Sequence, residues 1–94
     1  TATSPVANGG YRIQVFSDSN PRAHGEAKSK ATNINSKFPQ WKSYVTYAAP
    51  YWRLRIGDFT NYEDANDALS ALKDAFPAYK RELRIVRDHI NVGY

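Results

Sequence analysis

The sequence contains no cysteine, and it has only two histidines, His24 and His89. Without cysteine the chain cannot form a disulfide framework, a thiolate zinc site or a cysteine nucleophile, although many periplasmic domains also lack cysteine and the compartment stays open. Neither histidine has a metal-ligand or triad partner at a recognisable spacing, so we expect both to lie on the surface. The sequence therefore predicts no metal site and no cofactor.

Carboxylates placed for acid-base chemistry are also missing. Asp58 follows Gly57 where we expect a turn, and the Glu63-Asp64 pair falls in the first turn of an expected helix, where acidic side chains favour the helix dipole. Neither position indicates a glycosidase or amidase site. We therefore expect a protein that is not an enzyme.

Long apolar runs are absent as well. A transmembrane helix needs a run of about 18 apolar residues or more, and neither such a run nor a charged-then-apolar signal segment is present. We expect no membrane insertion within this segment, which reads as a soluble piece separated from any targeting signal. Residues 1–10, TATSPVANGG, are uncharged and poor in apolar mass, so we interpret them as a disordered linker, with a single domain over residues 11–94.

What the chain does contain is an internal duplication. The segment YRIQV at residues 11–15 returns as WRLRI at residues 52–56, and each copy is followed by a polar turn and an alanine-spaced segment. Both of those segments stop at a Phe-Pro pair, Phe38-Pro39 and Phe76-Pro77. Two copies of a strand-then-helix unit are indicated, and because each is too small to bury its own apolar face, they must pack together.

Periodicity places the elements. Alternation of apolar and polar residues predicts strands near residues 11–16, 42–47, 51–56 and 83–87. Asn20 as N-cap with Pro21 at the first helical position, and a stripe at Ala27, Ala31, Ile34 and Phe38, predict the first helix.

The second helix has a different start signal and the same kind of end. Thr60 with Glu63 reads as a capping box, and Ala65, Leu69, Leu72 and Phe76 form its apolar stripe before Pro77. The resulting order, β-α-β-β-α-β, predicts an α+β fold: a ribonucleoprotein-like sandwich of one four-stranded antiparallel sheet with both helices on one face and the other face open.

Charge is expected to differ between the two sides of this sandwich. The outward-facing strand positions carry only basic charges, with none acidic, at Arg12, Arg53, Arg55 and Arg84. The second helix is acidic, with Glu63, Asp64, Asp67 and Asp74 against Lys73. A basic open sheet favours an extended anionic polymer as ligand, although long arginine stems can also simply cover apolar strand surface.

Aromatic and amide side chains add to this open face. Tyr51 has the outward parity beside Arg53, and Tyr44 has it on the neighbouring strand if Val45 faces the core. A tyrosine ring suits stacking on a sugar or a base, and Gln14 can both donate and accept hydrogen bonds. Strand tyrosines are also common as core or edge residues.

The strings YRIQVF, SDSN, YVTYAAPYWRLRIGDF and LRIVRD resemble the SPOR domain, the sporulation-related repeat of bacterial envelope proteins, in the form common in Bacteroidetes. The resemblance covers residues 11 to about 90. It implies the fold described above and binding to peptidoglycan, in particular to denuded glycan strands from which amidases have removed the stem peptides. It also implies a location in the periplasm or cell envelope of a Gram-negative bacterium, at the division septum.

The resemblance also implies binding residues. Gln14, Ser17 and Tyr51 match the family's contacts on the first and third strands, and Val86 or Arg84 is the best placement of the contact on the last strand. The chain departs from the family at Phe16, where many members have glycine, so the exit from the first strand is expected to differ.

The chemistry of a denuded strand fits these residues. Removing the stem peptide turns the capped lactyl group of N-acetylmuramic acid into a free carboxylate, which Arg53 or Arg55 could bind while Tyr51 stacks on a pyranose and Gln14 holds an acetamido group.

Two other functions remain open. An RNA-binding module has the same topology, but YWRLRIGDF lacks the K/R-G-F/Y-G/A-F-V-x-F/Y pattern of such modules, so no nucleic-acid partner is expected. A protein-interaction domain that uses its sheet edge is the other alternative. The sequence predicts no particular oligomeric state.

Overall fold

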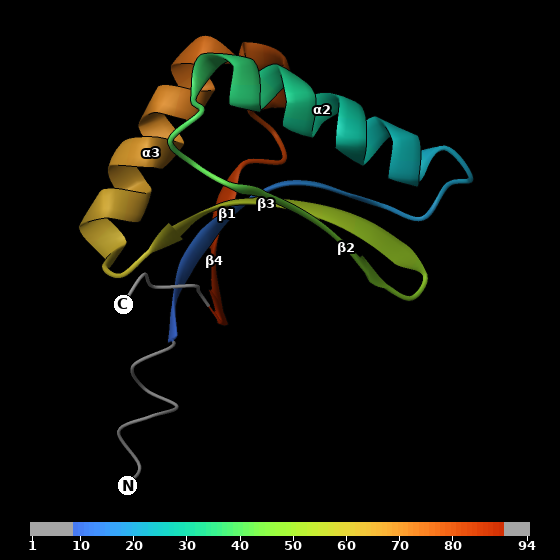
Figure 1. Cartoon of the computed structure of the whole chain (residues 1–94), viewed down its shortest axis with the longest axis horizontal. Helices are drawn as coiled ribbons and strands as arrows, with labels where there is room; N and C mark the ends of the chain where they lie inside the picture. The colour runs from blue at the N-terminus through green and yellow to red at the C-terminus, as the bar shows by residue number, and fades with distance from the viewer. Residues whose placement is uncertain (1–8, 90–94) are drawn as a thin grey trace, which may run out of the picture.

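The computed structural model describes residues 9–89, which form four strands, two α-helices and one short 3₁₀ helix (Figure 1). The rest of the expected linker, residues 1–8, and the last residues, 90–94, lie outside the described part. In chain order the elements are β1 Gly9–Asp18, α2 Ala23–Lys37, β2 Ser43–Ala48, β3 Tyr51–Phe59, α3 Tyr62–Ala75, η1 Pro77–Tyr79 and β4 Arg84–His89.

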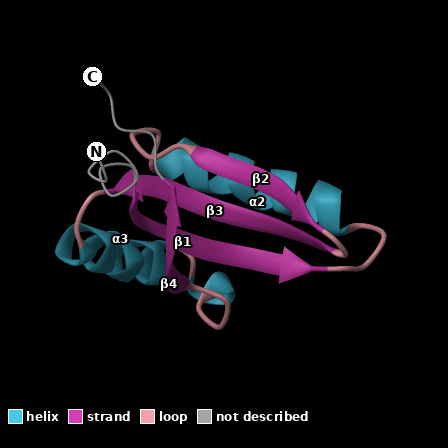
Figure 2. Ribbon diagram, turned by 90° about the horizontal axis from the view of Figure 1, so that it is seen from below, coloured by secondary structure: helices cyan, strands magenta, loops and turns pink. Residues whose placement is uncertain are grey.

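The strands form one antiparallel sheet in the order β2-β3-β1-β4. Both helices lie on the same side of it, α2 across β2 and β3 and α3 beside β1 and β4, and the opposite side is open (Figures 1 and 2). The predicted α+β fold with its β-α-β-β-α-β order is confirmed. β1 starts two residues earlier than expected, and β3 and β4 extend further, to Phe59 and His89.

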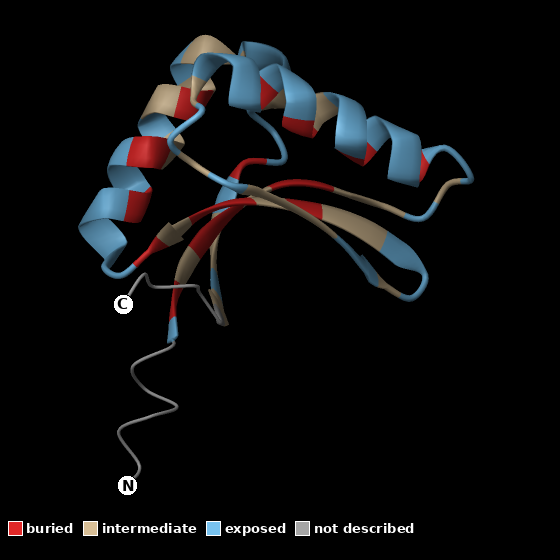
Figure 3. Ribbon diagram, viewed as in Figure 1, coloured by how far each residue is buried: buried red, intermediate tan, exposed pale blue. Residues whose placement is uncertain are grey.

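The core is the single layer between helices and sheet (Figure 3). Its largest fully buried side chains come from the sheet and from both helical stripes: Ile13, Val15, Leu54, Ile56, Ile34 and Leu72. Burying each of them contributes roughly 1.5–3 kcal/mol, so this layer is the main reason for the helices to stay on the sheet. Leu69, Phe38 and Phe76 pack at its margin and are only partly buried.

Two β-bulges interrupt the pairing of β1 with β3. The pairs Gln14–Arg55 and Phe16–Leu54 leave Val15 as an extra residue in β1, whereas Tyr11–Phe59 and Ile13–Ile56 leave one extra residue in β3. Gly57, with φ of +85°, lies at the second bulge, where its left-handed backbone favours glycine. Each bulge reverses the inward-outward alternation of the strand beyond it.

The first bulge corrects the expected orientation of Phe16. Simple alternation along residues 11–16 would place this side chain outward with those of Arg12 and Gln14, but it is paired with core residue Leu54 and is 8% exposed. Since Val15 is also buried, two consecutive residues face the core, as a bulged strand allows. The next residue, Ser17, pairs with Arg53 and therefore faces outward.

The starts of both helices differ from expectation by one or two residues. Asn20 does not cap α2: its carboxamide accepts from the backbone N–H of Arg22 at 2.7 Å in the turn before the helix, and the N-cap is Arg22. In α3 the cap is Asn61 and not Thr60, because the Asn61 Oδ1 accepts from the backbone N–H of Asp64 at 2.8 Å.

The predicted ends of the helices are confirmed. Phe38 and Phe76 are the C-caps of α2 and α3, and each donates its backbone N–H, to Ile34 and Leu72 respectively, at 2.8 Å. The following prolines cannot continue a helix, which explains the shared stop. In the described part of the chain, neither helix has the length and apolar character required to cross a membrane.

Replacing Asn61 with alanine tests the cap of α3. The substitution leaves the Asp64 N–H without its acceptor, so we expect the free energy of unfolding to fall by about 1 kcal/mol. Thr60→Ala is the matched control, since the Thr60 side chain is exposed and makes no hydrogen bond with the described residues. Urea unfolding of both variants measures this, and a larger loss for Thr60→Ala would contradict the assignment.

Candidate functional site

The strand pairing brings one residue from each strand into a row across the open face. Tyr44 of β2 pairs with Arg55 of β3, Arg55 with Gln14 of β1, and Gln14 with Arg84 of β4. All four belong to the predicted site. Antiparallel partners on one face lie close enough for their side chains to interact, so the row is a continuous polar strip.

A second group of predicted residues lies next to this row toward the β2–β3 turn. Ser17 and Arg53 are direct partners across β1 and β3, and Tyr51 follows two residues before Arg53 on the same face of β3. Tyr51 is 43% exposed. An exposed ring, a guanidinium and a hydroxyl are therefore neighbours on the open side of the sheet.

The last predicted contact on β4 has two candidates, and the structure places both on the open face. Arg84 pairs with Gln14, and Val86 pairs with Arg12. Arg84 is exposed and Val86 is partly buried. The two extend the surface to the edge of the sheet opposite β2.

The expectation that the open face carries no acidic charge is wrong. Asp58 and Asp88 both lie on it and bind arginines: Arg12 Nη2 is 3.0 Å from Asp58 Oδ1, and Arg12 Nη1 is 3.3 Å from Asp88 Oδ2. Arg55 Nη1 lies 2.8 Å from the same Asp88 oxygen. Two aspartates thus balance two of the four predicted arginines.

This ion-pair network is only partly accessible to solvent. Arg12 is 9% exposed, and its guanidinium carbon lies 4.0 Å from the centre of the Tyr44 ring. The Tyr44 hydroxyl donates to Asp58 Oδ2 at 2.5 Å. Arg12 therefore lies under the Tyr44 ring and between two carboxylates, where it supports the surface.

The other two arginines differ from these. Within residues 9–89, neither Arg53 nor Arg84 has an ion-pair partner, and Arg84 is exposed while Arg53 is half-buried. A guanidinium without a carboxylate partner keeps its capacity for charge-assisted hydrogen bonds. The positive charge that the open face can offer to a ligand is concentrated on these two side chains.

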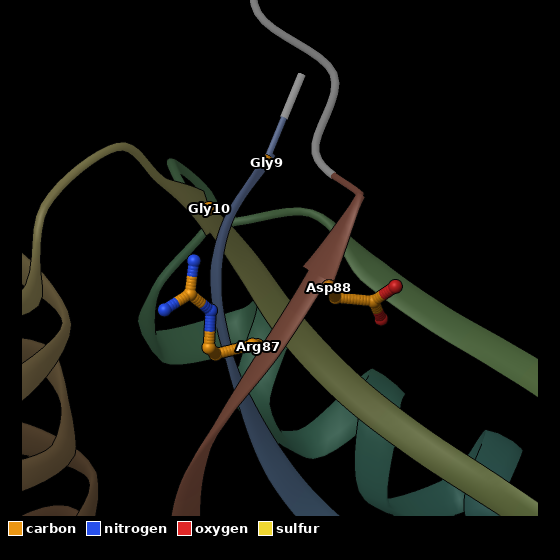
Figure 4. Close-up of a pocket in the computed structure, with 4 residues that line it drawn as sticks. All are labelled: Gly9, Gly10, Arg87 and Asp88. Carbon is orange, nitrogen blue, oxygen red and sulfur yellow. The ribbon is translucent and has the colours of Figure 1, made fainter. Parts of the chain in front are cut away.

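Asp88 lies beside a small hollow at the end of the sheet. The hollow has a volume of about 320 Å³ and is lined by Gly9, Gly10, Arg87 and Asp88. Figure 4 shows Arg87 and Asp88 projecting to opposite sides of β4, as the alternation of a strand requires. Arg87 lies near the Tyr11 ring, 5.6 Å from its centre, so only Asp88 belongs to the ion-pair network.

Both aspartates escaped the sequence prediction because they lie beyond the expected strand ends. Asp58 faces outward only because the bulge at Gly57 reverses the alternation of β3, and Asp88 belongs to β4 only because that strand continues to His89. The glycine inside YWRLRIGDF was the available signal, since glycine in a strand often marks a bulge.

Neither histidine belongs to the predicted site. His24 is exposed, as expected, and its ring stacks on Trp52 with a centroid distance of 4.0 Å. The side chain of His89 lies outside what the structure describes. Among the described residues, no three histidine or acidic side chains gather as metal ligands would.

The chain matches a protein-family model. The family model described as "SPOR domain" matches residues 7–79, well over half of the chain. That range includes Gln14, Ser17, Tyr51 and Arg53 and stops before β4. No curated protein and no solved structure matches the chain.

Two glycine substitutions test whether the bulge at Gly57 requires glycine, with Gly25 in α2 as the control. At Gly57 an added Cβ would overlap the Phe59 ring and the backbone is left-handed, so Gly57→Ala should lower the free energy of unfolding by on the order of 2–4 kcal/mol. Gly25 in α2 has open space around it, and Gly25→Ala should raise the free energy of unfolding by up to about 1 kcal/mol. Chemical unfolding that gave both variants the same sign would contradict this account.

Proposed function

Because this chain belongs to the SPOR domain family, whose members are peptidoglycan-binding modules of the cell envelope and not enzymes, we propose that it binds denuded glycan strands. Binding of this kind would direct its parent protein to the septum, where amidases remove the stem peptides. We further propose a periplasmic location in a Gram-negative bacterium.

One observation carries the proposal: an exposed ring and an arginine without a carboxylate partner among residues 9–89 lie side by side on the open sheet. Tyr51 and Arg53 share the outer face of β3, with Ser17 opposite Arg53 on β1. A tyrosine ring offers an apolar face for a pyranose, and a guanidinium binds a carboxylate through charge-assisted hydrogen bonds. A saccharide that bears a carboxylate satisfies both.

The charge of the ligand supplies the selectivity for denuded strands. In intact peptidoglycan the lactyl carboxyl of N-acetylmuramic acid is capped as an amide, and removal of the peptide leaves a free anion. Because Asp88 already holds Arg55, we assign the recognition of this anion to Arg53 and, at the sheet edge, to Arg84. Two available arginines suit a strand with one charge on each muramic acid.

Removing the Tyr51 ring tests the stacking contact. We expect Tyr51→Ala to weaken retention on denuded sacculi at least tenfold, because an aromatic anchor at an interface contributes ~2 kcal/mol or more. Tyr47→Ala is the matched control. Tyr47 is 57% exposed on the same hairpin, but it pairs with Trp52 and shares its face, so it lies on the helix side of the sheet and not on the open side. Co-sedimentation with purified sacculi measures both, and equal losses would remove Tyr51 from the site.

Removing the Arg53 charge tests the selectivity. Arg53→Gln should reduce binding to amidase-treated sacculi by roughly 10- to 100-fold, since a hydrogen bond to a charged group contributes about 1.5–3 kcal/mol. Binding to untreated sacculi should change little, because their lactyl groups are capped. Arg81→Gln removes the same charge from the turn before β4 and serves as control.

The same assay separates the alternatives. Retention that rises after amidase treatment and persists in excess yeast RNA supports a reader of denuded glycan. If the wild-type protein pelleted with neither preparation and was retained on RNA, the open sheet would be a nucleic-acid surface and the proposal would fall.

A further inference from the structure

The orientation of the Gln14 side chain is determined by its neighbour Arg55. The Gln14 Oε1 accepts two hydrogen bonds from Arg55, one from Nε and one from Nη2, each at 3.1 Å. A guanidinium has five donors and no acceptor, so the amide group cannot be turned the other way round without placing N–H groups against N–H groups. The oxygen of Gln14 must point to Arg55.

This arrangement leaves the amide nitrogen for a ligand. Gln14 Nε2 makes no hydrogen bond with any residue in the described part of the chain, and Gln14 lies half-buried on the open face between β3 and β4. Both hydrogen bonds reach the oxygen from the same guanidinium, so this oxygen faces Arg55. Gln14 therefore turns its two N–H donors, and not its oxygen, away from Arg55 and toward a ligand.

We propose that Arg55 is a positioning residue that makes Gln14 a donor-only contact, so that the ligand group bound there is an acceptor oxygen and not a hydroxyl or amide donor. The inference rests on the proposed glycan binding and refines it. On such a strand the acceptor is either the carbonyl oxygen of an acetamido group or a lactyl carboxylate oxygen.

Arg55 is itself held from the other side. Its Nη1 donates to Asp88 Oδ2 at 2.8 Å, and Asp88 also accepts from Arg12. Arg12 in turn binds Asp58, to which the Tyr44 hydroxyl donates. The guanidinium that orients Gln14 is thus tied to all four strands, and its rotation would break several charge-assisted hydrogen bonds.

A double-mutant cycle tests whether Arg55 acts through Gln14. Arg55→Lys keeps the charge but loses the two-pronged donor, so Gln14 can rotate, and we expect binding to denuded sacculi to fall three- to tenfold. In a Gln14→Ala background, Arg55→Lys should have no further effect. If the two losses multiplied, Arg55 would contact the ligand directly and the inference would be wrong.

Gln14→Glu tests the donor-only character. The carboxylate keeps the acceptor for Arg55, so the thermal midpoint should be unchanged or raised, while both donors are lost and binding should fall at least tenfold. Retained binding would mean that the ligand uses an acceptor on Gln14, which overturns the inference. Gln14→Ala removes the donors without adding a charge, so it identifies the acceptor oxygen: a greater loss on amidase-treated than on untreated sacculi assigns it to the lactyl carboxylate, and an equal loss assigns it to the acetamido carbonyl.

A measurement without ligand keeps this inference separate from the proposed function. In the nuclear magnetic resonance spectrum of the free protein, the Arg55 Nε–H should exchange slowly with solvent, and faster in the Gln14→Ala variant. Fast exchange in the wild type would refute the positioning geometry whether or not glycan binds. Slow exchange together with wild-type protein that fails to pellet would refute only the glycan proposal.

Discussion

The open face of this protein depends on two bulges that interrupt the alternation of its central strands. The extra residue at Val15 turns Phe16 into the core and Ser17 outward, and the one at Gly57 turns Asp58 outward and Phe59 into the core. Without them, the face would carry neither the Ser17 hydroxyl beside Arg53 nor the Asp58 carboxylate, one of the two that bind Arg12. The bulges also increase local twist, which fits the strongly twisted sheet of Figure 2.

Two aspartates determine how much positive charge the open face leaves unpaired. Four arginines on one open sheet would repel one another, but Asp58 and Asp88 bind two of them and hold their guanidinium groups in place. Exposed ion pairs contribute little to stability, but these side chains are only 11–23% exposed and share partners, so they act as one network. The positive charge without a carboxylate partner among residues 9–89 is therefore local, on Arg53 and Arg84, and is not spread over the whole open face.

Periodicity was enough to predict the order of elements, the side on which the helices lie and the outward position of Gln14, Tyr51 and Arg53, because these depend on which residues must be buried. Alternation alone could not locate the bulges, because an extra residue in a strand is recognised only when its partner strand is known, and Gly57 was a signal for the second bulge alone. Phe16 was misplaced for this reason, whereas Asp58 was expected in a turn because the third strand was predicted to end at Ile56. Ser17 was placed by resemblance, and alternation alone would have turned it inward.

The helix caps and the ion-pair network could not be predicted from the sequence either, because each depends on which single hydrogen bonds form. Thr60 and Asn61 are both good N-caps, and only the backbone geometry selects Asn61. Likewise, all four outward arginines look alike in the sequence, yet Arg12 is nearly buried and Arg55 is held by Asp88 and Gln14, while Arg53 and Arg84 have no carboxylate partner among residues 9–89. In the proposed site, arginines that orient the surface and arginines that contact the ligand therefore have the same chemistry, and they are distinguished by the partners that they already bind in the structure.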